Sequence, residues 1–170
     1  MAPSMAPRLI LDAGTGLRRV TGLLGGAPFT GTIILTHLHW DHVHGLPFFA
    51  AGDRPGARVT LMLPEQGSAG AEEVLALGMS PPHFPIRPSG LRGEWSFCGL
   101  APGVFTAEGF TVEAREVPHK GAAPSGTGSA TGIRPSPTYP ITARPCWGPA
   151  PRAGASTTPP RSAWPPAWTC

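Results

Sequence analysis

The sequence has no acidic residue after Glu116 and no histidine after His119, although it continues to residue 170. Cysteine is scarce as well: the three cysteines are widely spaced and form no CxxC pair, which argues against a disulfide framework and a thiolate zinc site. No run approaches the roughly 20 apolar residues of a membrane span. The first eight residues show no basic stretch followed by an apolar one, the pattern of a signal peptide. We therefore expect a soluble, cytoplasmic protein with no membrane partner and no disulfide partner.

Glycine and proline are abundant instead, with 23 of each. Together they exceed a quarter of the chain, a share typical of loops and disorder. The net charge of +3 would suit an anionic partner. However, the 13 Lys and Arg are scattered rather than clustered, so an RNA-binding module has little support.

The composition changes near residue 120. All ten Asp and Glu lie between Asp12 and Glu116, whereas residues 121–170 contain eleven prolines and almost no aliphatic periodicity. Such a stretch offers little apolar surface to offset the entropy of ordering it. We therefore predict a partial domain over residues 1–120, followed over 121–170 by a disordered, Pro/Ala/Gly-rich low-complexity tail.

Two explanations of this tail remain open. It is either a natural disordered tail or the product of a reading frame that slipped by one base near Lys120, and we favour the second. The Pro, Ala and Arg bias is what an out-of-frame, GC-rich message gives. A back-shifted reading of residues 121–151 also permits an aromatic strand, a turn, a β-branched strand and an Asp.

Residues 8–117 show alternating strand and helix patterns. Short β-branched or apolar runs predict strands, and the segment 32–36 is typical of a strand buried on both faces. Helical patterns lie between them. The predicted strands are 8–12, 32–36, 58–63, 95–100 and 110–117, and the predicted helices are 17–24, 45–51 and 69–79. This alternation predicts a layered α/β domain.

A histidine-rich run follows the second predicted strand. His37 and His39 alternate, so on an extended segment their side chains point the same way. The chain then turns, which allows Asp41 and His42 to face a second point nearby. Imidazole nitrogens with a carboxylate suit zinc, with manganese or iron as alternatives, and do not suit calcium.

The alternative interpretation of this run is a solvated histidine-rich loop, which its position after a strand and the intervening Asp41 make a poor one. His44 lies outside the ligand spacing, and we assign it a supporting or surface position. His83 lies in a proline-rich stretch and is interpreted as a loop histidine, with a substrate-facing position as the alternative.

The sequence resembles the metallo-β-lactamase superfamily, and within it the ribonuclease Z-like and phosphodiesterase-like branch. Three segments carry the resemblance: Leu11–Gly16 (LDAGTG), Thr36–His42 (THLHWDH, the HxHxDH motif) and Val117–His119 (VPH). They span roughly residues 8–120. The resemblance implies a four-layer αββα sandwich, incomplete in this chain, with two zinc ions where the two sheets meet.

The same resemblance implies roles for individual residues. His37, His39 and His119 would hold one ion, and Asp41 and His42 the other. Asp41 would also be the catalytic residue that orients the attacking water. Asp12 would fix the ring of a ligand histidine, although an Asp at this position could simply cap the following turn.

The chain departs from the family pattern in two places. The family supplies a metal-bridging Asp after the position of His119 and a final histidine, and neither has a counterpart here. A glycine-rich first hairpin usually precedes the Asp12 motif, and only eleven residues precede it here. We therefore expect a truncated chain with an incomplete site, which holds one zinc ion or none if the later ligands are needed.

The leading functional hypothesis is a metal-dependent hydrolase in which a metal-activated water attacks a phosphodiester, in a small molecule or in RNA. A lactonase or thioester hydrolase of the same fold is the alternative within the enzyme class. The alternative outside it is a non-catalytic remnant that still binds metal through His37, His39 and His119. The sequence leaves the substrate and the oligomeric state open.

Overall fold

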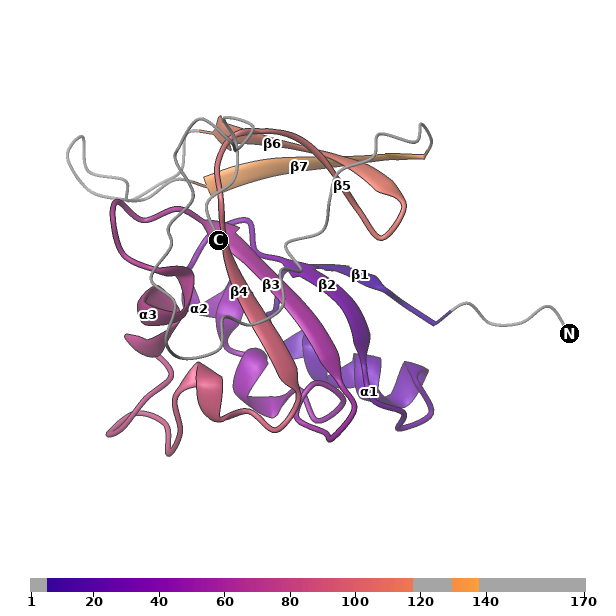
Figure 1. The fold of residues 1–170 in the computed structure, drawn as a ribbon, viewed down its shortest axis with the longest axis vertical. Helices are drawn as coiled ribbons and strands as arrows, with labels where there is room; N and C mark the ends of the chain where they lie inside the picture. The colour runs from indigo at the N-terminus through magenta and orange to yellow at the C-terminus, as the bar shows by residue number, and fades with distance from the viewer. Residues whose placement is uncertain (1–5, 118–129, 138–170) are drawn as a thin grey trace, which may run out of the picture.

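The computed structural model describes residues 6–117 and 130–137, which form two β-sheets and a layer of short helices (Figure 1). The larger sheet has the strand order β1-β2-β3-β4, and all neighbouring strands are parallel. Its strands are β1 (Leu9–Leu11), β2 (Thr30–Ile34), β3 (Arg58–Pro64) and β4 (Glu94–Leu100). Because all four run the same way, their carboxyl ends meet at one edge of the sheet.

The smaller sheet is antiparallel and has the order β5-β6-β7. Its strands are β5 (Gly103–Ala107), β6 (Phe110–Val117) and β7 (Ala130–Pro137). Strand β7 lies inside the segment 121–170 for which the sequence predicted disorder. Its prolines, Pro135 and Pro137, are compatible with a strand that has a neighbour on one side, because alternate N–H groups face away from that neighbour.

The helices between the strands are short and cover one face of the larger sheet (Figure 1). They are η1 (Thr15–Arg19), α1 (Val20–Leu23), α2 (Trp40–Val43), η2 (Leu46–Phe48), α3 (Ala71–Ala76) and η3 (Pro88–Gly90), where η denotes a 3₁₀ helix. The predicted helices 17–24, 45–51 and 69–79 are thus present in shorter or partly 3₁₀ form. In the part of the chain that the structure describes, no helix has the length and apolarity needed to cross a bilayer.

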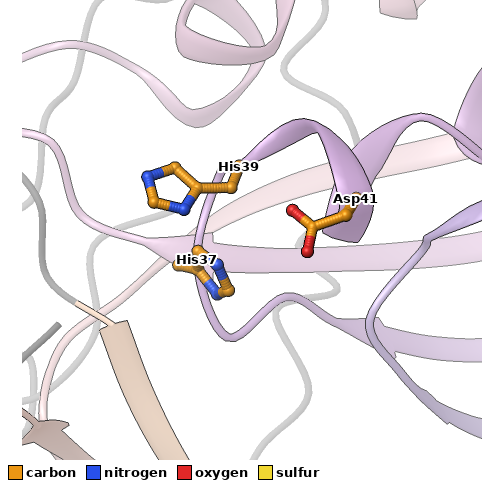
Figure 2. A group of neighbouring side chains, drawn as sticks. All are labelled: His37, His39 and Asp41. Atoms are coloured by element: carbon orange, nitrogen blue, oxygen red, sulfur yellow. The ribbon is translucent and has the colours of Figure 1, made fainter. Parts of the chain in front are cut away.

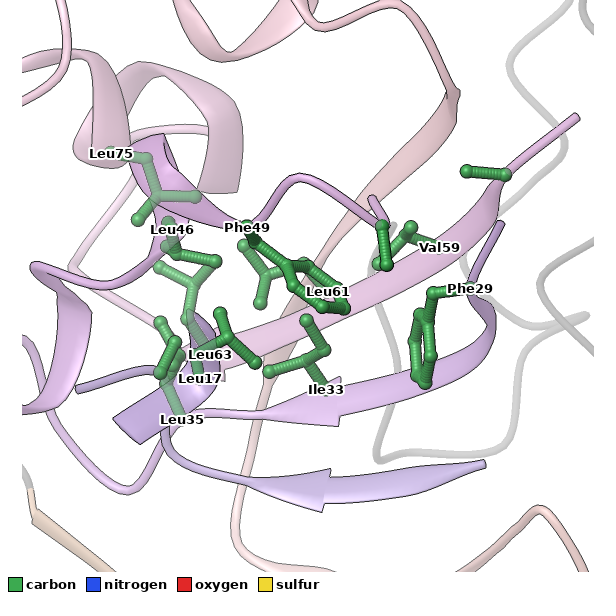
Figure 3. Close-up of a cluster of buried hydrophobic side chains, with 13 residues drawn as sticks. Leu17, Phe29, Ile33, Leu35, Leu46, Phe49, Val59, Leu61, Leu63 and Leu75 are labelled. Atoms are coloured by element: carbon green, nitrogen blue, oxygen red, sulfur yellow. The ribbon is translucent and has the colours of Figure 1, made fainter. Parts of the chain in front are cut away.

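The helix-facing side of the larger sheet carries the first of two hydrophobic clusters (Figure 3). Alternate residues of β2 and β3 point into it, and the helices supply the opposite wall. Its fully or nearly fully buried members include Leu17, Phe29, Ile33, Leu35, Leu46, Phe49, Val59, Leu61, Leu63 and Leu75.

The second cluster lies between the two sheets. Ile34, Met62, Cys98 and Leu100 enter it from the larger sheet, and Phe105, Ala107, Val112 and Ala114 from the smaller one. Since Ile33 and Ile34 are both fully buried but in different clusters, strand β2 is covered on both faces, as its composition predicted. The order of layers is helices, parallel sheet, antiparallel sheet, which agrees with a partial αββα sandwich. A second helical layer does not occur within 6–117 or 130–137.

A polar contact also joins the two sheets. Glu108, in the turn between β5 and β6, accepts a hydrogen bond from the buried Thr32 hydroxyl of β2 at 3.0 Å and pairs with Arg8 at 3.0 Å. The turn of the small sheet is thereby tied to the edge of the large one.

Candidate metal centre

The site begins where β1 and β2 end side by side. Leu11 lies opposite Ile34 in the parallel register, so Asp12 and Thr36 emerge at the same edge of the sheet. The Asp12 N–H continues the ladder by donating to the Ile34 carbonyl at 2.8 Å. Asp12 then takes a positive φ of 61°, which few residues other than glycine adopt and which Asp tolerates. Its side chain can therefore reach across to the loop after β2.

The Asp12 carboxylate organises that loop through both of its oxygens. Oδ1 accepts hydrogen bonds from the backbone N–H and from the hydroxyl of Thr36, each at 2.8 Å. Oδ2 lies 2.9 Å from Nδ1 of His42. The Thr36 hydroxyl in turn lies 3.0 Å from Nδ1 of His37. The Asp12 carboxylate and the Thr36 hydroxyl thus orient the imidazoles of His37 and His42.

Helix α2 places the remaining donors. His39 precedes it in an extended conformation, and Asp41 occupies its first turn, where the positive end of the helix dipole favours a carboxylate. Two backbone hydrogen bonds of 2.7 Å connect Ala13 to this helix and the residues after it. The Ala13 N–H donates to the His42 carbonyl, and the Gly45 N–H donates to the Ala13 carbonyl.

This close backbone packing requires glycine at two positions. A Cβ atom at Gly45 would lie 2.0 Å from the Gly14 carbonyl oxygen, and one at Gly14 would lie 2.2 Å from the Asp41 carbonyl oxygen. Any side chain at either position would push the Asp12 loop away from α2. The sequence interpretation did not assign a role to Thr36 or Gly45. Both residues flank the histidine run in the sequence, but their roles follow only from contacts in the folded structure.

Three side chains converge on one point: His37, His39 and Asp41 (Figure 2). One donor atom from each lies within 4.8 Å of the other two. The rings of His37 and His39 stand edge to face with centroids 4.7 Å apart. In Figure 2 the Asp41 carboxylate extends from α2 toward the two imidazoles. Within residues 6–117 and 130–137, this is the one group of at least three such donors.

The group fits a divalent metal ion. Two ligand atoms on one zinc ion can be at most about 4.2 Å apart, twice the metal–ligand distance. The donor atoms here all lie within 4.8 Å of one another, so an inward rotation of a side chain would bring them to this spacing. The Asp41 side chain, 78% exposed, is not hindered by packing from making it. Two imidazoles and a carboxylate are also the donor set that zinc, manganese and iron accept.

His42 lies beside this group. Its ring is 3.8 Å from that of His37, centroid to centroid, and its Nε2 lies 3.3 Å from Oδ2 of Asp41. The structure therefore brings together four of the predicted ligands, His37, His39, Asp41 and His42, with Asp12 behind them. It differs from the predicted division in one respect, because Asp41 faces both the His37–His39 pair and His42.

The other predicted histidines lie elsewhere. His119 falls outside the described residues, so its ligand role remains a prediction. His44 is exposed at the end of α2, where its ring stacks on the exposed Trp40 at 4.7 Å. His83 is exposed in the turn after α3, and its N–H donates to the Ser80 carbonyl.

Comparison with known proteins agrees with this geometry. A family profile described as the Metallo-beta-lactamase superfamily matches residues 7–88, the segment that contains Asp12 and the whole histidine run. This match agrees with the resemblance that Leu11–Gly16 and Thr36–His42 carry.

A solved structure described as "Crystal Structure of a New Diphosphatase from the PhnP Family" is similar to this chain, with 19% sequence identity and a TM-score of 0.48. The alignment covers 75% of this chain and 44% of that one, so the chain spans less than half of that protein's length. A search of curated proteins finds no match.

Proposed function

We propose that this chain is a metal-dependent hydrolase that cleaves a phosphodiester or a related ester. The observation that carries the proposal is the convergence of His37, His39 and Asp41 beside His42, in a segment that the Metallo-beta-lactamase superfamily profile matches. His39 and Asp41 are exposed, so a substrate can reach the donor group from solvent.

The chemistry divides between the ion and the protein. A bound divalent ion such as zinc lowers the pKa of a coordinated water and polarises the oxygen of the bond to be cleaved. His37, His39 and Asp41 would hold such an ion at the sheet edge. Asp12 and Thr36 keep the rings of His37 and His42 in place through the contacts described above. Asp41 has two oxygens, and we assign it the further task of orienting the water and accepting its proton.

The substrate class rests on the resemblance of Leu11–Gly16 and Thr36–His42 to the phosphodiesterase-like and ribonuclease Z-like branch. A phosphodiester in a small molecule is therefore our first choice, and RNA our second. A lactone or thioester is the alternative, since the same attack works at a carbonyl carbon and one fold serves many substrates.

A second candidate function, a non-catalytic metal-binding protein, is favoured by one observation. Among the described residues only one group of three donors converges, and the sequence from Val117 to Cys170 adds His119 but no carboxylate side chain. A chain that binds zinc tightly and hydrolyses nothing would fit this alternative.

The test is hydrolysis by the purified, zinc-loaded chain of bis(p-nitrophenyl) phosphate, an aliphatic lactone and an acyl thioester. We expect hydrolysis of the phosphodiester, removed by a chelator and by His37→Ala, and retained in the control His83→Ala, which changes an exposed histidine elsewhere. Preferred cleavage of the lactone or the thioester would show that the substrate belongs to that class and not to the phosphodiesters. Bound zinc without hydrolysis of any of the three would favour the metal-binding alternative.

A further inference from the structure

The solvent side of the metal loop carries a large aromatic ring. Trp40 lies between His39 and Asp41 in the sequence and is 71% exposed. Leu38 and Val43 pack against the first hydrophobic cluster, whereas Trp40 belongs to neither of the two clusters. Helix α2 is therefore anchored to the core without the indole, which stays in contact with solvent.

Exposed rings follow one another along this part of the chain. His44 and Gly45 both have right-handed helical backbone angles, so α2 and η2 form one nearly continuous segment from Trp40 to Phe48. Residues four positions apart lie on the same side of a helix. Trp40, His44 and Phe48 have this spacing, and all three are exposed. The solvent side of an amphipathic helix normally carries polar and charged residues, so two large apolar rings on this side point to a binding surface.

The indole of Trp40 has a neighbour that fixes its orientation. The imidazole of His44 stacks on it, with ring centroids 4.7 Å apart and an angle of 24° between the ring planes. Stacking on one face leaves the other face of the indole turned to solvent, in agreement with its high exposure. An oriented ring with one open face is the arrangement on which a further flat ring can stack.

We propose that Trp40, oriented by His44, binds a flat aromatic group of the substrate, and that this group is a nucleobase. The proposal rests on the proposed function, because it places the ring beside a phosphodiester bound at the donor group. The Cα atom of Trp40 lies about 3.8 Å from those of His39 and Asp41, its neighbours in the chain. A sugar separates the base of a nucleotide from its phosphate, so the base needs a partner beside the donor group rather than within it.

The position of Trp40 favours a nucleobase over an aliphatic chain or a protein partner. An aliphatic chain is best bound by an enclosed apolar surface, whereas one open ring face suits stacking. A protein that covered Trp40 would also cover the exposed side chains of His39 and Asp41 and would shield the donor group from substrate. Trp40 is thus assigned as a specificity residue, and bond cleavage stays with the donor group.

The experiment compares two ligands that differ in the base. Adenosine 5′-monophosphate and ribose 5-phosphate share the phosphorylated sugar, and calorimetry with the zinc-loaded, full 170-residue chain gives the affinity of each. We expect the adenosine ligand to bind about tenfold more tightly. Trp40→Ala should remove this preference and leave the affinity for ribose 5-phosphate within about twofold. Trp40→Phe should keep part of the preference, because a smaller ring still stacks.

Two further variants test the details of the arrangement. His44→Ala should reduce the preference for the base by about threefold, because the indole loses the ring that orients it. Leu77→Ala is the matched control, since it changes an 81% exposed apolar side chain at the end of α3 and should leave both affinities unchanged. Circular dichroism verifies that each variant is folded. Cleavage of adenylyl-adenosine and of a longer oligoadenylate, compared by chromatography of the products, distinguishes a small nucleotide ester from RNA.

Three outcomes overturn the proposal. The first is equal affinity of the unaltered chain for the two ligands, or no binding of either. The second is an equal loss of both affinities in Trp40→Ala, which would show that the substitution disturbs the metal loop rather than a stacking surface. The third is a dimer that Trp40→Ala dissociates while the preference for the base persists, which would assign the ring to a contact between two copies.

Hydrolysis of bis(p-nitrophenyl) phosphate by the unaltered chain separates this proposal from the proposed function. Hydrolysis without a Trp40-dependent preference for the base leaves the proposed function intact and removes the nucleobase surface. A Trp40-dependent preference without hydrolysis supports the nucleobase surface and removes the proposed function.

Discussion

The metal loop has an anchored end and an exposed end, and the two differ in what they contact. Thr36 and His42 are tied to Asp12 by hydrogen bonds and an ion pair of 2.8–2.9 Å. His39 and Asp41, in contrast, are exposed at the surface, and each has a donor atom within 4.8 Å of the other and of His37. The difference teaches that one short motif contains residues that hold the loop and residues that we propose as metal ligands. Mutations should separate the two groups.

The largest effect is expected beneath the anchored end, from Gly45→Ala. The new Cβ would lie 2.0 Å from the Gly14 carbonyl oxygen, so backbone must move and the hydrogen bond to Ala13 is lost. We expect a loss of about 3 kcal/mol in the free energy of unfolding, measured with urea. Gly16→Ala is the matched control, because a Cβ there meets nothing within 4 Å. Equal losses in the two variants would contradict the tight contact.

The next effect is expected at the exposed end, from His39→Ala. Zinc affinity at the His37–His39 position should fall by about 100-fold, equivalent to about 2.7 kcal/mol. The stability of the metal-free chain should stay within about 0.5 kcal/mol, since the side chain is exposed. Calorimetric titration and metal-free urea unfolding give the two numbers. A large loss of metal-free stability would show that His39 belongs with the anchoring residues.

A smaller effect is expected from Thr36→Val, at the anchored end. It removes the hydroxyl that donates to Asp12 and contacts His37, at a cost of about 1.5 kcal/mol in unfolding free energy. Zinc affinity should also fall, by about tenfold, because the ring of His37 loses an orienting contact.

Thr106→Val is the control for this change. The Thr106 hydroxyl is buried and has no hydrogen-bond partner in the described structure, so its removal should be neutral or stabilising. Equal destabilisation by the two valine substitutions would mean that the Thr36 hydrogen bonds contribute nothing.

The smallest effect is expected far from the metal loop, at Asp53. Burial raises the pKa of this carboxyl, but the hydrogen bonds from the backbone and guanidinium of Arg92, together with its charge, outweigh burial and lower the pKa below 3.8. A lowered folded-state pKa stabilises the fold above 3.8, and this contribution is lost as the pH falls through the lowered value.

Asp53→Asn should therefore cost about 1 kcal/mol at pH 6, and the difference from the unaltered chain should shrink below pH 3.8. Urea unfolding across this pH range measures it. Glu94→Gln, at the exposed cross-strand ion pair with Arg58, is the control and should change stability by less than about 0.5 kcal/mol. A difference that persists unchanged at the lowest pH would contradict the assignment to this carboxylate.

Much of the fold could be predicted from local sequence patterns. The β-branched run 32–36 and the apolar run 58–63 indicated buried strands, and β2 and β3 lie at the centre of the larger sheet. Strand β5 was missed because five residues between a proline and a glycine turn carry too little periodicity to stand out. Helix α2 was missed because His39–His42 were interpreted only as a ligand loop, although Asp41 in a first turn favours a helix.

The strand over residues 130–137 was not predicted from the sequence. Low apolar content predicted disorder for residues 121–170, yet residues 130–137 pair along the whole of β6. Strand pairing to an existing edge uses backbone groups, which composition does not reveal. The frame-shift hypothesis stays a prediction, and the coding DNA tests it: a shifted frame after codon 120 should give an alternating strand followed by an Asp.

The sequence predicted which residues lie in the site better than it predicted how their side chains are arranged. The spacing of Thr36–His42 identified the three donors that converge and His42 beside them, because alternation on an extended segment and one helical turn are local rules. That Asp41 faces both histidine sets depends on how α2 rests on the Asp12 loop, which is a tertiary contact between segments about 30 residues apart.

The hydrogen bond between Asp12 and Thr36 spans only 24 residues of sequence, and all described donors lie between it and Gly45. Closing a loop of that size is entropically inexpensive, and contacts of low sequence separation form fast. The metal loop is therefore suited to assemble early as the chain folds, before the antiparallel sheet is completed.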